Sequence, residues 1–384
     1  MQEAEPISAP GPDGLAPRSR TGALLVLATM CATVAFGWLL GPYGAALSAV
    51  GLTMAPLAFL AVLVHVGADR EWARGCALAL LLALAALVVV MFVGQTGDLL
   101  SARHGPRADE YAGQIYAIAG VSASGVVLSL LLLAPWARRW LAGFLPIDAG
   151  SFAHAVAVSM AVTLIVSACA PLLVLGEPVI TAAAAIEAAD KGAAADPGDP
   201  AALFEQVYQL LWLVPVCLLA AGYGVRRDFR GALARLGLTW PTGRQVLGAV
   251  GLALLVAFVA LVLGAAVNGL WEALGWAATD QGDVETLMGY MLTPVGALVV
   301  GVCAGLGEEL LVRGVLQPRL GLVLSNTLFT AMHAGQYGWD MLLVIFFVGT
   351  AFGLVRKHSS TTVSALVHGL YDAVLILLAV SAVG

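Results

Sequence analysis

Six ionisable side chains in the last third of the chain interrupt otherwise apolar sequence, in three short motifs. They are Glu308, Glu309 and Arg313 in the first motif, His333 in the second, and His368 and Asp372 in the third. An ionisable group inside an apolar span costs free energy unless it is paired or hydrated, and such groups commonly mark functional sites. These residues are therefore the candidates for chemistry.

The spacing within the motifs indicates which side chains share a helix face. Glu309 and Arg313 are four residues apart and can form an ion pair, whereas Glu308 points about 100° away from that face. This leaves Glu308 as the unpaired carboxylate. His368 and Asp372 are likewise four residues apart and stack one turn apart in the last apolar span.

The depth of each side chain follows from the helical rise of about 1.5 Å per residue. Counted from the helix ends expected on the cytoplasmic side, His368 lies about 10 Å deep, Glu308 about 14 Å, Asp372 about 16 Å and His333 about 21 Å. Phe329 precedes His333 by four residues and is expected to support it on the same face. Three helices thus bring these polar side chains to overlapping depth, nearer to the cytoplasmic face.

This set of residue types suits hydrolysis of a peptide bond. A carboxylate in a low-dielectric cavity can take a proton from water, as a general base must. Imidazole N–H groups can donate to the oxyanion that forms during acyl transfer. Glu308 with His333 could therefore activate water, and His368 with Asp372 could orient the substrate carbonyl or stabilise the oxyanion.

The order of the three motifs in consecutive helices resembles the CPBP family. That family comprises the CAAX prenyl endopeptidases of the Ras-converting type and the bacteriocin-processing and Abi-type intramembrane peptidases. The motifs that carry the resemblance are Glu308-Glu309…Arg313, Phe329…His333 and His368…Asp372. It covers roughly residues 245–384 with the Leu-Gly-Leu-Thr-Trp-Pro lead-in, and it leaves the first six helices without an assigned role.

The resemblance also implies roles for individual residues. Glu308 would be the water-activating glutamate, as in a glutamic endopeptidase, with His333 as its partner, and His368 with Asp372 would form the pair on the oxyanion side. Asp372 stands where some members of the family carry Asn, and a carboxylate stabilises an oxyanion less well unless it is protonated or paired with His368.

The resemblance further implies that Glu309 and Arg313 pair structurally beside the site.

A metal-dependent mechanism is the alternative for the same residues. The chain contains no His-Glu-x-x-His sequence, which argues against a zinc site of that type, and we expect no cofactor. Two histidines and two carboxylates could still bind a metal ion. In that case Glu308, His333 and His368 would be the ligands and zinc the expected ion.

The composition requires these motifs to lie in membrane-spanning helices. Hydrophobic residues make up 60% of the chain and charged residues only 11%, far from the roughly 25% charged residues of soluble domains. We predict an all-α, polytopic transmembrane bundle of about eleven helices, of which the C-terminal five form a CPBP-like core. The predicted spans are 21–40, 44–66, 76–94, 113–136, 152–175, 207–225, 245–270, 288–316, 320–334, 340–355 and 360–383.

The distribution of basic residues predicts the orientation of these helices. Placing the N-terminus in the cytoplasm puts fifteen of the eighteen Lys and Arg residues on the cytoplasmic side, as the positive-inside rule requires. The loops 176–206 and 271–287 then lie outside and are acidic. We expect an integral protein of a bacterial plasma membrane, with the site facing the cytoplasm. Its partners would be the lipid bilayer and a membrane-associated peptide or protein substrate, with no nucleic acid.

Changes in composition along the chain suggest four regions. Residues 1–20 read as a disordered cytoplasmic tail, 21–225 as a six-helix membrane module, 226–244 as a basic cytoplasmic linker, and 245–384 as the CPBP-like peptidase domain. Within the last region, Gly301-Val-Cys-Ala-Gly305 and Gly349-Thr-Ala-Phe-Gly353 have the small-xxx-small spacing that lets helices approach closely.

Two functions other than proteolysis fit the same sequence. A CPBP-like protein without proteolysis could act as a membrane scaffold or immunity protein. A proton-coupled transporter could use Glu308 and Asp372 as relays. It would need a continuous polar path, for which the outer halves of these helices offer few residues.

Overall fold

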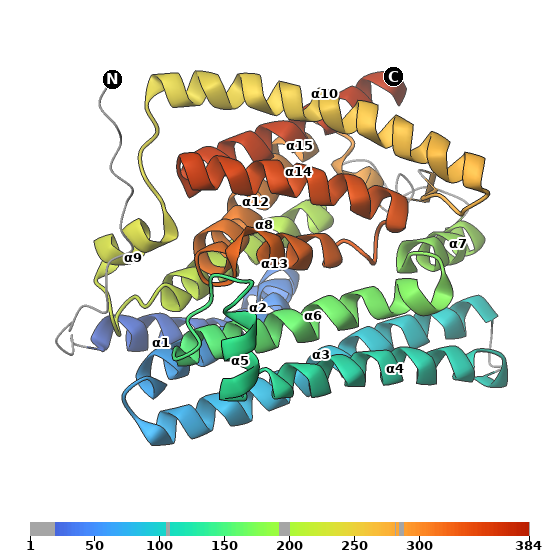
Figure 1. The fold of residues 1–384 in the computed structure, drawn as a ribbon. Coiled ribbons are helices and arrows are strands. Elements are labelled where there is room, and N and C mark those ends of the chain that lie inside the picture. The colour runs from blue at the N-terminus through green and yellow to red at the C-terminus, as the bar shows by residue number, and fades with distance from the viewer. Residues whose placement is uncertain (1–19, 105–107, 192–199, 281, 284–287, 384) are drawn as a thin grey trace.

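The chain folds into a bundle of long helices, most of which run lengthwise between the two ends of the bundle (Figure 1). The computed structural model describes residues 20–104, 108–191, 200–280, 282–283 and 288–383. Within these ranges the regular structure is helical, without a β-strand, which confirms the predicted all-α class. The tail predicted over residues 1–20 lies, apart from its last residue, outside the described residues.

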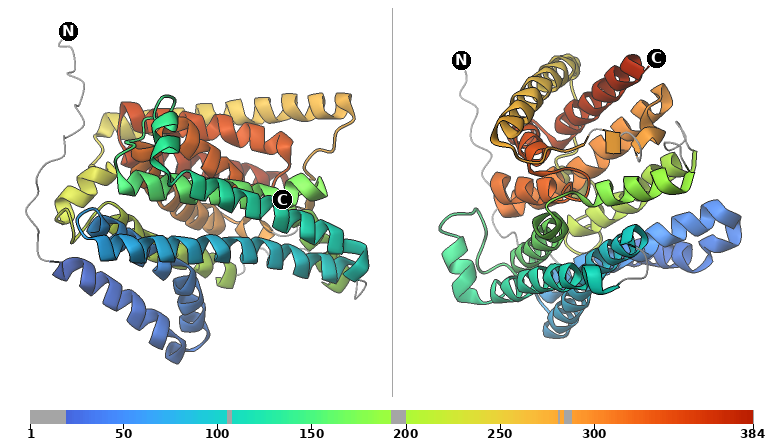
Figure 2. Two further views of the ribbon diagram at one scale, coloured as in Figure 1. Left: turned by 60° about the horizontal axis from the view of Figure 1, so that its bottom comes forward. Right: turned by 90° about the vertical axis from the view of Figure 1, so that its right-hand side faces the viewer.

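The first half of the chain contributes six long helices and three short ones. The long helices are α1 (Thr21–Phe36), α2 (Gly41–Gly67), α3 (Glu71–His104), α4 (Ala108–Leu131), α6 (Phe152–Leu175) and α8 (Pro200–Ala220). The short ones are η1 (Gly37–Leu40), α5 (Pro135–Leu141) and α7 (Val179–Lys191). Figure 2 shows α1 and the start of α2 at one edge of the bundle.

The second half carries the candidate site. Its elements are α9 (Phe229–Leu236), α10 (Gly243–Leu274), η2 (Gly289–Met291), α12 (Pro294–Glu309), η3 (Leu310–Leu316), α13 (Gln317–Ala331), α14 (Trp339–His358) and α15 (Thr361–Val383). The segment η3 is π-helical and joins α12 directly to α13. Short π-helical segments inside helices are frequent at functional sites.

Nine segments of the described chain are long and apolar enough to cross a membrane. Two of them contain a break: Thr21–Gly67 is interrupted by η1, and Pro294–Ala331 is interrupted at Gly321, whose φ is 76°. Divided at these breaks, the segments overlap with the eleven predicted spans, with ends that differ by up to ten residues. Helices α7 and α9, in contrast, lie in regions that the sequence predicted as loop and linker.

Backbone contact between glycines brings α12 and α15 together. A Cβ added at Gly301 would lie 2.6 Å from the Gly369 carbonyl oxygen, and one added at Gly305 would lie 2.6 Å from the Gly369 nitrogen. Gly349 and Gly353 of α14 similarly face side chains of α13 too closely to admit a Cβ. Both small-xxx-small motifs therefore set the helix packing around the site, as predicted.

Helices of the first half pack directly on the site-bearing helices. Leu210 and Leu213 of α8 lie 3.5 and 3.4 Å from the position of a Cβ on Gly307, next to the Glu308 motif. Helix α6 shares a buried cluster with α13, in which Val158 and Leu328 take part. The predicted boundary at residues 226–244 thus separates two regions of sequence that are joined in space.

Candidate functional site

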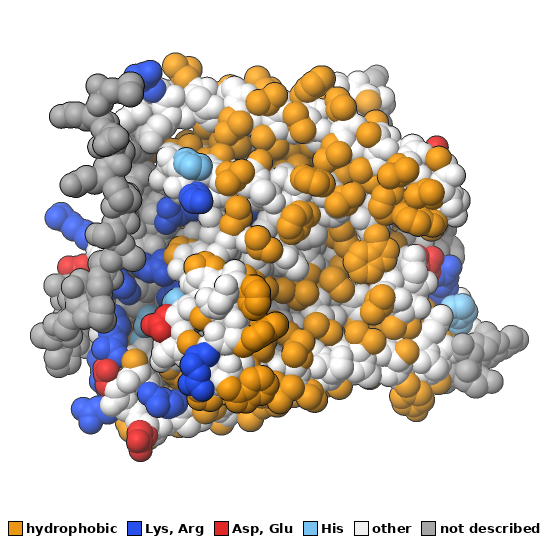
Figure 3. Space-filling view, viewed as in Figure 1, with side chains coloured by type: hydrophobic (Ala, Val, Ile, Leu, Met, Phe, Trp, Pro, Cys, Tyr) orange, Lys and Arg blue, Asp and Glu red, His pale blue; other side chains and the backbone are white. Residues whose placement is uncertain are grey.

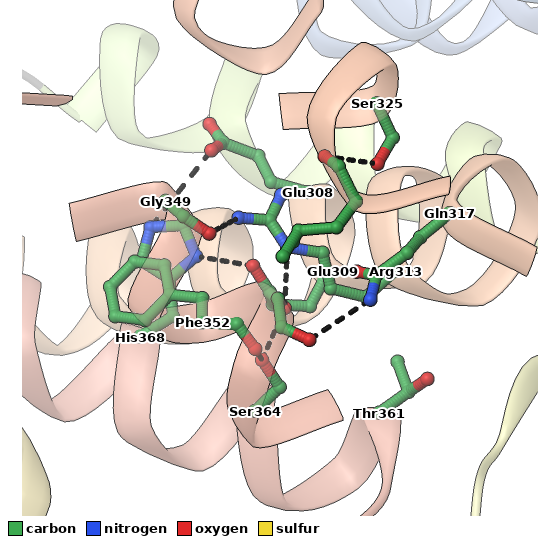
Figure 4. Close-up of polar contacts among 12 residues, drawn as sticks. Glu308, Glu309, Arg313, Gln317, Ser325, Gly349, Phe352, Thr361, Ser364 and His368 are labelled. Carbon is green, nitrogen blue, oxygen red and sulfur yellow. Dashed lines mark hydrogen bonds and ion pairs between the residues drawn. The ribbon is translucent and has the colours of Figure 1, made fainter. Parts of the chain in front are cut away.

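Glu309 is the centre of a buried polar cluster at the end of α12. Its side chain is 0% exposed. One carboxylate oxygen lies 3.1 Å from Nδ1 of His368, and the other accepts a hydrogen bond from Ser364 at 2.6 Å and lies 3.5 Å from Nε of Arg313. Figure 4 shows these side chains converging from α12, η3 and α15. Each oxygen of Glu309 is thus engaged by at least one donor.

Arg313 balances the charge of Glu309. Its Nη2 donates to the Gly349 carbonyl of α14 at 2.7 Å, and its guanidinium lies 4.7 Å from the centre of the Phe329 ring. The ion pair that the spacing predicted is present, but Glu309 also holds His368 and Ser364, which the spacing did not indicate. Glu309 is therefore both a partner of Arg313 and a positioning group for His368.

His368 is held between carboxylates on both of its ring nitrogens. Nδ1 donates to Glu309, since a carboxylate can only accept. Nε2 lies 3.4 Å from Asp372 and 3.9 Å from Glu308. The ring of Phe352 stacks on the imidazole at a centroid distance of 4.3 Å. Glu309 and Phe352 thus fix the ring, and Nε2 is the nitrogen left to act between Asp372 and Glu308.

Glu308 differs from its neighbour Glu309 in exposure. The Glu308 side chain is 38% exposed, whereas that of Glu309 is fully buried. The difference follows from the helix, because consecutive side chains point about 100° apart. Glu308 is consequently the carboxylate of this pair that water or a substrate can reach.

His333 lies in the turn that follows α13. Its Nδ1 donates to the Phe329 carbonyl oxygen at 2.8 Å, which leaves Nε2 free. The Phe329 ring lies 4.9 Å from the His333 ring and 6.0 Å from that of His368, so this ring contacts both histidines. Within the described residues no hydrogen bond or ion pair joins Glu308 to His333. The Glu308 carboxylate instead points toward α15, where Nε2 of His368 lies 3.9 Å away.

Tyr337 adds a polar group that the motifs did not include. It follows His333 by four residues, and the two rings stack at 6.5 Å. Burial, and then the charge of Asp372, raise the pKa of Tyr337 above its usual value. The phenol therefore stays protonated, next to the ring of His333.

Sequence reasoning missed Ser364 and Phe352 as well. Ser364 precedes His368 by four residues, and this same-face spacing was a usable signal. Phe352 lies on a different helix, within a run of apolar residues, and no sequence feature distinguishes its ring from ordinary packing.

The arrangement does not fit the metal site considered as the alternative. In the part of the chain that the structure describes, no group of three or more His, Cys, Asp or Glu side chains could hold a metal ion. Of the three expected ligands, His368 has a carboxylate facing each nitrogen, and His333 is bound through Nδ1 to the Phe329 carbonyl oxygen.

Comparison with protein families identifies the same part of the chain. Residues 290–374 match the family described as type II CAAX prenyl endopeptidase Rce1-like. This range spans α12, η3, α13 and α14 and most of α15, and it contains all six ionisable residues of the three motifs. No curated protein and no solved structure matched the chain.

Proposed function

Residues 290–374 form an Rce1-like segment of the CPBP family of intramembrane peptidases, and from this premise we propose that the chain is an intramembrane endopeptidase. It would hydrolyse a peptide bond in a membrane-associated protein or peptide. The observation that carries the proposal is the placement of an accessible carboxylate, Glu308, beside an imidazole that Glu309 and Phe352 hold rigidly.

In the proposed reaction Glu308 accepts a proton from water, which attacks the scissile carbonyl. The same carboxyl group then returns the proton to the leaving amine. His333 serves as a second acceptor for the attacking water, because its bond from Nδ1 to a backbone carbonyl leaves Nε2 free. For Glu308 and His333 to act on the same water molecule, the water and the substrate would have to occupy the space beside Phe329.

His368 takes the oxyanion side of the reaction. Its Nε2–H donates to the developing negative charge while Nδ1 remains bound to Glu309. Asp372, at 3.4 Å from Nε2, orients the imidazole before substrate binds. The buried charge of Arg313 offsets that of Glu309, so the supporting pair adds little net charge to the site.

The proposal is tested by the reaction of the purified full-length chain in liposomes. Two probes would be used: a prenylated peptide with a CAAX-type terminus, as the family description suggests, and an acylated leader-type peptide. In water enriched in oxygen-18, we expect one labelled oxygen in the new carboxyl terminus of the product. A metal chelator should leave the rate unchanged. Failure to hydrolyse any membrane-anchored probe would contradict the proposal and favour a scaffold, and flux that depends on a pH gradient would favour a transporter.

A further inference from the structure

Two arginines from different elements meet at the carboxyl end of α8. Nη1 of Arg227 donates to the Ala221 carbonyl at 2.8 Å, and Nη2 of Arg319 donates to the adjacent Ala220 carbonyl at 2.7 Å. Arg319 is almost fully buried, and it also donates to Val315 at 2.6 Å. The two guanidinium groups are thus fixed beside each other at the basic end of the bundle.

Two more arginines extend this group along α9. A Cβ on Gly237, directly after α9, would lie 2.6 Å from Nη2 of Arg356, so that guanidinium covers the end of the helix. Arg235 occupies the last turn of α9. Burial, and then the charges of Arg227 and Arg356, lower the pKa of Arg235 to about 10. Ala221, which follows α8, and Leu236 of α9 share one buried cluster. Arg356 packs against Gly237, so the four arginines gather around the carboxyl ends of α8 and α9.

Protein carboxylates do not neutralise this cluster within the described residues. The nearby pair between Arg226 and Asp69, at 2.6 Å, uses a different arginine, and Asp228 is engaged as the N-cap of α9. Arg235 and Arg356 form no hydrogen bond or ion pair in the described part of the chain, and Nε of Arg356 is buried without a partner. Arg235 and Arg356 are partly exposed, so an anion from outside the chain can reach them and offset their charge.

Capping of α8 explains only half of the cluster. Basic side chains at a helix carboxyl end interact favourably with the last carbonyl groups and with the helix dipole. This accounts for Arg227 and Arg319, which bind such carbonyls. Arg235 and Arg356 lie in the last turns of α9 and α14, but within the described residues neither donates a hydrogen bond to a terminal carbonyl group.

The surroundings of the cluster are those of a membrane surface. Figure 3 shows Lys and Arg side chains gathered along the edge where α9 lies, with hydrophobic side chains over the rest of the face. The α9 residue Phe229 is exposed, and Trp240, between α9 and α10, is 98% exposed. Tryptophan favours the interface between hydrocarbon and headgroups, and basic pockets between spanning helices bind lipid headgroups.

We propose that Arg227, Arg235, Arg319 and Arg356 form a binding site for the phosphate headgroup of an anionic membrane lipid. The exposed aromatic side chains beside the cluster favour a lipid over free phosphate, because they can contact its glycerol and acyl region. The site is separate from the carboxylate cluster and does not depend on the chain being a peptidase.

The test compares thermal unfolding of the purified full-length chain with phosphatidylglycerol and with phosphatidylcholine added to neutral detergent. We expect phosphatidylglycerol alone to raise the unfolding temperature, and native mass spectrometry to detect retained lipid. In the R235Q/R356Q variant the affinity should fall at least tenfold. The matched control R70Q/R139Q removes two exposed arginines from the same face and should keep the wild-type affinity.

The same variant also separates ligand binding from a structural role. In neutral detergent without lipid, R235Q/R356Q should unfold at the same temperature as the wild type or higher, because it removes mutual repulsion. A lower temperature would show that these arginines stabilise the fold directly and would overturn the proposal. Equal effects of the two lipids, or equal loss in the control variant, would also overturn it. Inorganic phosphate reproducing the full stabilisation would identify a soluble anion instead of a lipid.

Discussion

At the scale of single residues, the site depends on a difference between two adjacent glutamates. Glu309 is enclosed by Arg313, Ser364 and His368, whereas Glu308 is partly exposed and faces Nε2 of His368. Glu309 is thus engaged by side chains of the protein, whereas Glu308 is accessible to water or a substrate. Replacement by glutamine should therefore lower stability at Glu309 and leave stability nearly unchanged at Glu308.

The E309Q variant should lose stability. Replacing Glu309 leaves Arg313 buried without its counter-charge, and breaking a buried pair in this way costs about 3–5 kcal/mol. The E308Q variant should unfold within about 0.5 kcal/mol of the wild type, as is usual for accessible positions. Thermal or denaturant unfolding of both variants in the same detergent measures the difference. Equal stability of the two variants would contradict the assignment of Glu309 as the structural member.

The D372N variant should remain active if the proposed peptidase reaction is correct. An asparagine can keep the contact with His368, and its amide can also donate to an oxyanion. The expected kcat is within about threefold of the wild type or higher, whereas D372L should lose on the order of tenfold or more through misorientation of the imidazole. A D372N variant as inactive as D372L would assign an essential proton-transfer role to the carboxylate.

At the scale of elements, the site depends on how closely α12 and α15 approach. Gly301 and Gly305 face Gly369 across the contact, next to His368 in the sequence. Backbone atoms of Gly369 are the nearest neighbours of both glycines, so the distance between the Glu308 motif and His368 is set by backbone packing. A single added methyl group should therefore disturb both stability and chemistry.

The G369A variant tests this dependence. Overpacking at such a contact typically costs about 1–3 kcal/mol, and the shift of His368 should lower peptidase activity further. The control is G251A in α10, where a Cβ would meet nothing within 4 Å. It should be neutral or slightly stabilising. Unfolding temperature and cleavage rate measured for both variants decide the matter, and identical behaviour of the two would refute the role of the contact.

The sequence predicted these elements to different extents. Apolar runs predicted the spans well, because a hydrocarbon environment requires long uncharged helices. The paired glycines were also recognisable from their spacing. The direction of Glu308 toward α15 was not predictable, since it depends on the packing of three helices and on the π-helical segment that follows Glu309. Ser364 had a sequence signal, whereas Phe352 had none.

At the scale of the whole molecule, Lys and Arg residues are concentrated at one end of the bundle. Lys and Arg residues lie in the segments that follow α2 and α8, at the end of α14 and in the short helices α5 and α9. The helices between the two ends present apolar side chains outward. Both halves of the chain share this arrangement. Helices α6 and α8 of the first half pack on the helices that carry the site. The predicted boundary between modules describes a change in composition and does not mark independent packing units.

Cysteine labelling tests the predicted orientation. In a variant lacking the five native cysteines, L40C and W240C introduce thiols at positions that are 77% and 98% exposed, which the predicted orientation places outside and in the cytoplasm, respectively. With the basic end in the cytoplasm, a membrane-impermeant maleimide should label L40C in intact cells and W240C only after the cells are opened. The reverse pattern would place the basic end outside, contrary to the positive-inside rule.

The central claim is that Glu308 activates water in an intramembrane peptidase, and the most direct test is the cleavage rate of E308Q. The matched control is E272Q, the same change at an exposed position at the far end of α10. We predict that E308Q loses on the order of a thousandfold or more in kcat at wild-type stability, whereas E272Q cleaves at the wild-type rate. An E308Q variant that remains folded and cleaves at the wild-type rate would contradict the account.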